Sequence, residues 1–177
     1  MILKMQNDTR QRKALFVEDA MAHPAKGHIA MWQECIDRYS QPGDLILDPM
    51  GGIGTSLIGA LMGRNVVCVE LEQHFIEPMA ASWQKMRQRP MLGYELGQVL
   101  ILRGDARGLP LKSADTIISS PPYANRLADT YVDDDPQRMS YEMGKSKIQS
   151  ADSVLFSPPY ESLIDNVEGP GAGSKGS

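Results

Sequence analysis

The sequence predicts an α/β fold with a parallel sheet, because short apolar runs alternate with stretches of helical periodicity over the first two thirds of the chain. Strands buried on both faces of a sheet read as continuous runs of Val, Ile and Leu. Such runs occupy residues 44–48, 66–70, 99–102 and 116–119. Strands that alternate with helices are typical of right-handed crossovers in one parallel sheet.

The stretches between these runs have helical spacing and suitable ends. In residues 28–39, Ile29, Trp32 and Ile36 recur on one helical face, and Pro42-Gly43 breaks the pattern. Residues 55–63 read as a short helix that ends at a glycine, and residues 74–89 as a helix that stops at Pro90. The secondary structure of residues 19–31 is ambiguous from the sequence, except that helical spacing begins at residue 28. Residues 154–156 could form a fifth strand.

Length and composition favour one globular domain. The chain has 177 residues, 42% of them hydrophobic and 23% charged, which excludes wholesale disorder and fibrous classes. We expect a domain over residues 1–165 with its core in residues 20–125, followed by a flexible Gly/Ser-rich tail over residues 166–177. No apolar run is long enough for a membrane span and the first residues are polar, so a soluble, cytoplasmic protein is expected.

Charge and cysteine content indicate which ligands and partners to expect. The two cysteines, Cys35 and Cys68, lack the spacing of a disulfide framework or a zinc site, and no metal is expected. Residues 1–123 carry 13 basic and 13 acidic residues, whereas residues 124–177 carry 5 and 9. A nucleic-acid partner usually requires a basic surface, and the composition does not indicate one.

The segment Asp48-Pro-Met-Gly-Gly-Ile-Gly-Thr55 follows a predicted strand and opens a predicted helix. In parallel sheets, ligands bind at the carboxyl ends of the strands, and glycines there let a ligand approach the backbone. A nicotinamide dinucleotide would need a third glycine where Leu57 stands. The carboxylate of Asp48 suits a cationic or hydroxyl-bearing ligand better than a pyrophosphate.

Two further acids end neighbouring strands. Glu70 is placed to accept hydrogen bonds from the ribose hydroxyls of an adenosine ligand, and Asp105 to reach the amine of an adenine ring. Taken alone, Glu70 could be a surface carboxylate and Asp105 a loop-start residue. Together with the glycine turn, these acids suit a nucleoside without phosphates and with a cationic sulfonium, which describes S-adenosylmethionine.

The segment Ser120-Pro-Pro-Tyr123 follows the fourth predicted strand directly. Prolines cannot donate to a strand ladder, so at a strand end they stiffen the backbone and direct its carbonyl groups. The ring of Tyr123 offers a flat face on which a nucleobase can stack. Without the other motifs, the segment could be a proline-rich loop with a packing tyrosine.

The order of these motifs over about residues 20–125 resembles the amino-group DNA methyltransferases, which methylate adenine N6 or cytosine N4. The resemblance implies a Rossmann-like, S-adenosylmethionine-dependent methyltransferase fold, and a His-Pro segment near the methionine end of the cofactor. Read alone, His23 could be a loop or core histidine. The implied cofactor-binding residues are His23, Pro24, Asp48, Pro49, Gly51, Gly52, Gly54, Thr55, Glu70, Leu71, Asp105 and Ala106. The implied catalytic residues are Ser120, Pro121, Pro122 and Tyr123.

This chemistry would use double-stranded DNA with the target base flipped out of the helix. Hydrogen bonds from the base amine to the Ser120 hydroxyl and the Pro121 carbonyl would free its lone pair for in-line attack on the sulfonium methyl. The leading serine of the motif favours cytosine N4 over adenine N6. A restriction-modification setting is the expected context.

Two features depart from the family pattern. A complete enzyme resembles a seven-stranded sheet with a target-recognition region, so this chain predicts an incomplete sheet at its C-terminal side. A second subunit or a homo-oligomer could then supply DNA recognition. In addition, the segment Ser113 to Tyr123 recurs 37 positions later as Ser150 to Tyr160, with a second Ser-Pro-Pro-Tyr. A non-catalytic cofactor-binding or partner-pairing module, or an enzyme acting on RNA or protein glutamine, stay open as alternatives.

Overall fold

A five-stranded parallel sheet forms the centre of the molecule. The computed structural model describes residues 7–22, 27–109, 111–120 and 150–156. The strands lie in the order β3-β2-β1-β4-β5, and every neighbouring pair is parallel. Their bounds are β1 Leu45–Asp48, β2 Asn65–Glu70, β3 Val99–Arg103, β4 Ser113–Ser119 and β5 Ser150–Phe156. The α/β class and the four predicted strands are confirmed, and the fifth run is a strand as well.

The helical segments are α1 Thr9–Leu15, η1 Asp19–Ala22, α2 Ile29–Tyr39, η2 Thr55–Leu57, α3 Ile58–Leu61, α4 Gln73–Met86 and η3 Ala106–Gly108. The three helices that the sequence predicts are present, the one over residues 55–63 as η2 followed by α3, and α1, η1 and η3 are additions. Helix α1 was not predicted, because its inward face includes Arg12, which is only 4% exposed and interrupts the apolar period. The guanidinium of Arg12 is accommodated by the Asp8 carboxylate and the Gly27 carbonyl.

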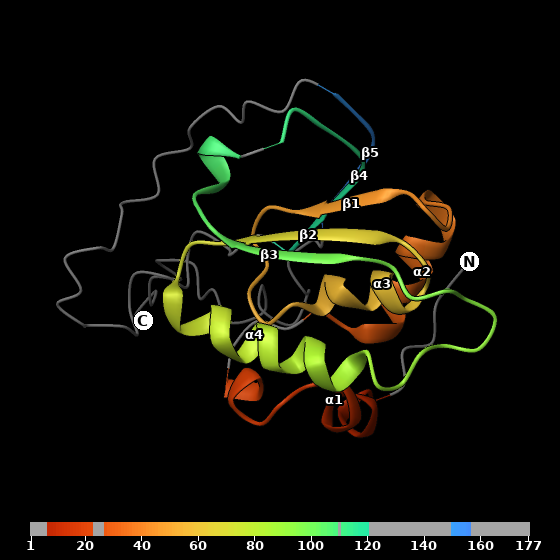
Figure 1. Ribbon diagram of the computed structural model, residues 1–177, viewed down its shortest axis with the longest axis vertical. Helices are drawn as coiled ribbons and strands as arrows, with labels where there is room; N and C mark the ends of the chain where they lie inside the picture. Colours follow the sequence, from red (N-terminus) through yellow and green to blue (C-terminus); the bar gives the residue numbers. More distant parts are fainter. Residues whose placement is uncertain (1–6, 23–26, 110, 121–149, 157–177) are drawn as a thin grey trace, which may run out of the picture.

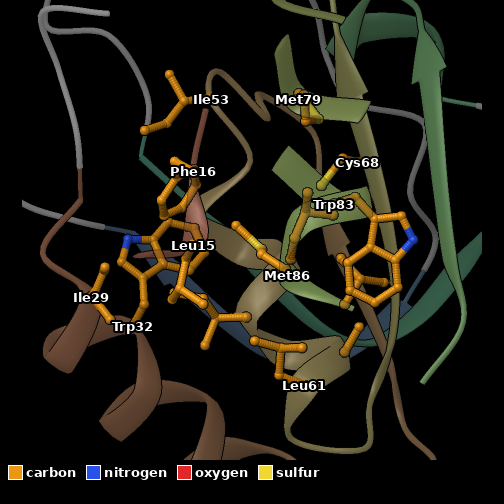
Figure 2. Close-up of a cluster of buried hydrophobic side chains, with 14 of the residues drawn as sticks. Leu15, Phe16, Ile29, Trp32, Ile53, Leu61, Cys68, Met79, Trp83 and Met86 are labelled. Atoms are coloured by element: carbon orange, nitrogen blue, oxygen red, sulfur yellow. The ribbon is translucent and has the colours of Figure 1, made fainter. Parts of the chain in front are cut away.

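Two hydrophobic clusters cover the two faces of the sheet. The larger cluster joins helices α1, α2, α3 and α4 to the face that carries Ile46, Val66 and Cys68. Figure 1 shows α1, α3 and α4 on the same side of the strands. In Figure 2, Phe16, Trp32, Met79, Trp83 and Met86 bring these helices together in one core. The smaller cluster lies on the opposite face and contains Leu47, Val67, Val69, Ala114 and Ile117.

Strand β4 is tied to β1 and α2 by two polar contacts in addition to the sheet pairing. The Leu45 amide donates to the Asp115 carboxylate at 2.7 Å, and the Thr116 hydroxyl donates to the Tyr39 carbonyl at 2.8 Å. These contacts place β4 next to the strand that ends at Asp48. Among the helices in the described part of the chain, none is long and apolar enough to cross a membrane.

The turn between β1 and α3 depends on glycine for two separate reasons. Gly52 and Gly54 have φ of +51° and +81°, which is the left-handed region that disfavours other residues. The turn also packs closely on α4, because a Cβ added at Gly54 would lie 2.7 Å from Met79 Cγ and 2.8 Å from Leu57 Cδ1. The backbone conformation therefore favours glycine at both positions, and packing against the core requires it at Gly54 before any ligand is considered.

We expect the substitution Gly54→Ala to destabilise the fold by about 2–4 kcal/mol, because the left-handed backbone and the overpacking both cost free energy. Gly43→Ala is the matched control, since Gly43 has φ of +96° but nothing within 4 Å of an added Cβ. Urea unfolding should show only the backbone cost there, about 1–2 kcal/mol. Equal losses in the two variants would contradict the packing argument.

Candidate functional site

The carboxyl ends of β2, β1 and β4 bring the predicted site residues to one edge of the sheet. Glu70 ends β2, Asp48 ends β1, and Ser120 follows β4 directly. Because the strands are parallel and adjacent, these three residues lie side by side at the edge where such sheets bind ligands. Asp105 follows β3, the outer neighbour of β2. The sequence therefore predicted the relative placement of the acids and of Ser120.

The Glu70 carboxylate holds the glycine turn in place. One oxygen accepts from the Gly52 amide at 2.7 Å and the other from the Glu72 amide at 2.9 Å. Glu70 is 8% exposed, so most of its surface is already covered by these loops. Each carboxylate oxygen has a second lone pair, which leaves acceptor capacity for a ligand hydroxyl. Glu70 thus has a role in the turn itself that the sequence did not reveal.

Asp48 is buried beneath the turn rather than displayed at the surface. It is 2% exposed, and its carboxylate accepts from the Met50 amide at 3.2 Å, an arrangement that closes a local turn. Burial raises the pKa of Asp48 to about 7; a hydrogen bond with Ser56 opposes the shift, and the nearby charge of Glu70 adds to it. Without a neighbouring cation, this group would hold a proton for part of the time at neutral pH.

Two residues that the sequence did not single out line the Asp48 carboxyl. Ser56 is fully buried, and its hydroxyl lies 3.1 Å from the Cys68 thiol. Cys68 is the register partner of Asp48 on β2, so both side chains lie on the helix-covered face of the sheet. Burial raises the pKa of the Cys68 thiol, which keeps it protonated. A buried, protonated thiol of this kind is chemically inert.

Asp105 is engaged by its own loop. Its carboxylate forms an ion pair with Arg107, with Nη2 at 2.5 Å, and also accepts from the Arg107 amide at 2.8 Å. The hydrogen bond from the Arg107 side chain lowers the pKa of Asp105. A ligand amine at this position would share the carboxylate with Arg107, a partner that the sequence analysis did not consider.

The remaining predicted residues divide into two groups. Gly51, Gly54 and Thr55 are buried in the turn, and Pro49, Gly52, Leu71 and Ala106 are half-buried beside it or at the neighbouring strand ends. His23, Pro24, Pro121, Pro122 and Tyr123 lie outside the described residues, as does the second Ser-Pro-Pro-Tyr at residues 157–160. The Gly/Ser-rich tail lies outside them too.

The segment that precedes α2 has an anchor that the sequence analysis missed. The Asp8 carboxylate accepts from Arg12 at 2.8 Å and from the Ile29 amide at 3.0 Å. This joins α1 to the first turn of α2, immediately after the predicted His-Pro segment. A carboxylate followed four residues later by arginine is the sequence signal for such a pair.

The sheet order also distinguishes the two copies of the Ser-Pro-Pro-Tyr motif. Strand β4, which leads into Ser120, pairs directly with β1 and lies beside the end that carries Asp48. Strand β5, which leads into the second copy, pairs with β4 and is one strand further from Asp48. The first copy therefore follows the strand nearest to the glycine turn.

Comparison with known proteins concerns the part of the site that contains Asp48, the glycine turn and Glu70. Residues 3–82 match a family model described as a DNA methylase. The first half of this chain resembles the amino-group DNA methylases. The Type II methyltransferase M2.MboI of Moraxella bovis is 31% identical in an alignment of 85 residues that covers 43% of this chain and 31% of that protein. The resemblance predicted from the motifs is confirmed, but the matched segment ends before Asp105 and Ser120.

The similarity to solved structures covers part of each chain at low sequence identity. The YjhP protein of E. coli has a TM-score of 0.45 and 16% identity, with 62% of this chain and 43% of that one covered. The tRNA (uracil-54, C5)-methyltransferase of Pyrococcus abyssi, solved with S-adenosyl-L-homocysteine, has a TM-score of 0.41 and 17% identity, over 52% of this chain and 21% of that one. In each comparison described here, this chain spans less than half of the relative's length.

The raised pKa of Asp48 predicts a pH-dependent stability. Between the ordinary pKa of 3.8 and about 7, the folded state keeps a proton that the unfolded state releases, so stability falls as pH rises through this window. Relative to Asp48→Asn, the wild type should lose about 4 kcal/mol between pH 4 and pH 8. Urea unfolding of both proteins checks this, with Asp37→Asn, an exposed carboxyl on α2, as control. A difference that does not change with pH would contradict the burial of an ionisable Asp48.

Proposed function

We propose that this chain acts as an S-adenosylmethionine-dependent DNA methyltransferase that transfers a methyl group to an exocyclic amine of a base. One observation carries the proposal: the buried acids and the glycine turn at the ends of β1 and β2 adjoin the strand that leads into Ser120. The resemblance of residues 3–82 to a DNA methylase supports it. A DNA substrate would place the activity in the cytoplasm.

The residues at this edge suit the cofactor. Its ribose hydroxyls and adenine amine are donors, and its sulfonium and ammonium groups are cations, so it calls for acceptors and negative charge. Glu70 retains acceptor capacity for the hydroxyls. Asp105 follows β3, the strand next to β2, and its carboxylate could accept from the adenine amine. Asp48 supplies a carboxyl whose ionised form a cation would favour. When bound, the cofactor would provide an electrophilic methyl group on a sulfonium.

The base would be held by Ser120, Pro121, Pro122 and Tyr123, of which only Ser120 is among the described residues. An amine conjugated to a base ring is a poor nucleophile. Hydrogen bonds from this amine to the Ser120 hydroxyl and the Pro121 carbonyl would favour a pyramidal nitrogen, and the ring of Tyr123 would stack on the flipped base. The residues would then contribute mainly by positioning.

Within this activity we favour cytosine N4 over adenine N6, since serine rather than aspartate leads the motif at position 120. We also propose that DNA recognition comes from a second subunit or another copy of the chain, in a restriction-modification context. Residues 124–177 carry 5 basic and 9 acidic residues, so the composition does not indicate the basic surface that DNA binding usually requires.

The decisive experiment is methyl transfer. The chain is expressed in a host that lacks DNA methylation, and the DNA nucleosides are analysed by mass spectrometry. We expect N4-methylcytosine in the wild type and none in Ser120→Ala. N6-methyladenine alone would correct the base, and unmethylated DNA together with intact cofactor binding would support a non-catalytic module instead.

Cofactor binding can be tested separately by calorimetry with S-adenosylhomocysteine. We expect Glu70→Ala to weaken binding at least about tenfold, because it removes a buried acceptor and also releases the Gly52 amide. Glu72→Gln is the matched control, because its exposed carboxylate contacts only the exposed His74 among the described residues. Unchanged affinity in Glu70→Ala would refute the site.

The roles of Tyr123 and Tyr160, which end the two Ser-Pro-Pro-Tyr segments, can be compared by measuring the turnover of their alanine variants. Tyr123→Ala should lower turnover about tenfold or more through lost stacking, with cofactor affinity nearly unchanged. Tyr160→Ala should have a smaller effect, because the strand before it is not adjacent to β1. Equal losses in the two variants would show that the choice between the copies is wrong.

A further inference from the structure

The internal repeat of the sequence forms two adjacent strands in matching register. Ser113-Ala-Asp-Thr-Ile-Ile-Ser119 is β4, and Ser150-Ala-Asp-Ser-Val-Leu-Phe156 is β5. Ser113 pairs with Ser150 and Ile118 with Leu155, so each residue lies beside the one 37 positions later. The two copies are therefore equivalent in position along the sheet; their first three residues are identical, and Phe156 stands where the first copy has the buried Ser119.

The second copy also keeps the groups that fasten the first copy to β1. In β4, the Asp115 carboxylate accepts from the Leu45 amide and the Thr116 hydroxyl donates to the Tyr39 carbonyl. The corresponding residues of β5 are Asp152 and Ser153, which again offer a carboxylate and a hydroxyl. In β5 these groups lie one strand away from β1 and α2, where they cannot make the same contacts.

We propose that Ser150–Phe156 is a second strand competent to dock on β1, and that it can take the place of β4 there. In that arrangement the second Ser-Pro-Pro-Tyr would follow the strand beside Asp48. The exchange itself does not depend on the proposed methyl transfer, which is tested separately.

Chain connectivity permits the exchange. Residues 104–112 join the carboxyl end of β3 to the start of β4 at the opposite end of the sheet, so they cover about 23 Å along the strands and about 14 Å across three strand spacings, a direct span of about 27 Å. A shift of β4 by one further spacing raises this span to about 30 Å, which remains within the about 33 Å that ten extended Cα steps can reach. Residues 120–149 join β4 to β5, which is ample length for a shift of one strand. Neither connection therefore prevents β4 from leaving its position.

The described arrangement should be the major one. Ile117, which is 7% exposed in β4, corresponds to Val154 in β5, which is smaller and 52% exposed. The larger side chain buries more apolar surface in the central position, so the first copy is favoured there. The second copy would occupy the position beside β1 as a minor state.

Disulfide trapping tests this directly. In a Cys35→Ala, Cys68→Ala background, Leu47→Cys is combined with Val154→Cys. Leu47 and Val154 are separated by Ile117 of β4, so their Cα atoms lie about 10 Å apart, beyond the about 7 Å that a disulfide can bridge. An intrachain disulfide between them requires β5 to reach β1.

The sheet offers a matched control on its other side. Leu47 and Leu100 are separated by Val67 of β2 in the same way, and Leu100 is 50% exposed. We expect the Leu47–Val154 cysteine pair to cross-link under mild oxidation at least about threefold faster than the Leu47–Leu100 pair. The reason is that only the first pair comes into contact in the minor state, which the disulfide then traps. Leu47→Cys with Ile117→Cys, direct neighbours, reports that the background is folded. Equal rates for the two separated pairs, or a disulfide-linked dimer, would overturn the proposal.

A second arm tests the polar anchors. Asp115→Ala removes the contact with Leu45 and should speed cross-linking of the Val154 pair, whereas Asp152→Ala should slow it. The Leu100 pair measures any general loosening caused by either change. If cross-linking of the Val154 pair responds to neither substitution, the equivalence of the two copies is refuted.

Discussion

The hydrogen bond between the Gly52 amide and the Glu70 carboxylate is the contact on which the functional edge depends. At 2.7 Å, it fastens the turn after β1 to the end of β2, so that one acid both shapes the turn and lies at the strand ends proposed to bind the cofactor. A turn of glycines alone would have many conformations, because glycine restricts the backbone so little. The charge-assisted bond to a nearly buried carboxylate selects one of them.

Hydrogen bonding and packing also hold the groups next to this contact in place. Asp48 closes the start of the turn through the Met50 amide, and Met79 of α4 packs against its glycines from below. The acids therefore lie in a region whose shape is set by packing. A consequence is the raised pKa of Asp48, since the packing that orders the turn also removes water from this carboxyl. A cationic ligand would relieve that cost by favouring the ionised form.

The sheet order relates the two halves of the proposed chemistry. Strand β1 lies between β2, which supplies Glu70, and β4, which leads into Ser120. The cofactor side and the base side of the site are thus brought together by adjacent strands, with no need for a distant loop. The repeat in β5 lies beside β4, one strand further from β1. Its Asp152 and Ser153 offer the same kinds of group, a carboxylate and a hydroxyl, with which β4 contacts β1 and α2.

The sequence by itself determined the α/β class, four strands and the placement of Asp48, Glu70 and Ser120 at strand ends, because buried runs, glycine turns and parallel connectivity are local signals. It did not reveal α1, whose buried Arg12 is compensated by Asp8 and by the Gly27 carbonyl, 15 residues further along the chain. The ion pair of Asp105 with Arg107, the burial of Asp48 against Ser56 and Cys68, and the register of the two repeats were decided by the tertiary structure. The ion pair joins residues two apart in the loop after β3, so it depends on the conformation of that loop. The burial of Asp48 and the register of the repeats depend on which groups meet across strands and on how much water they lose, and neither quantity is local in sequence.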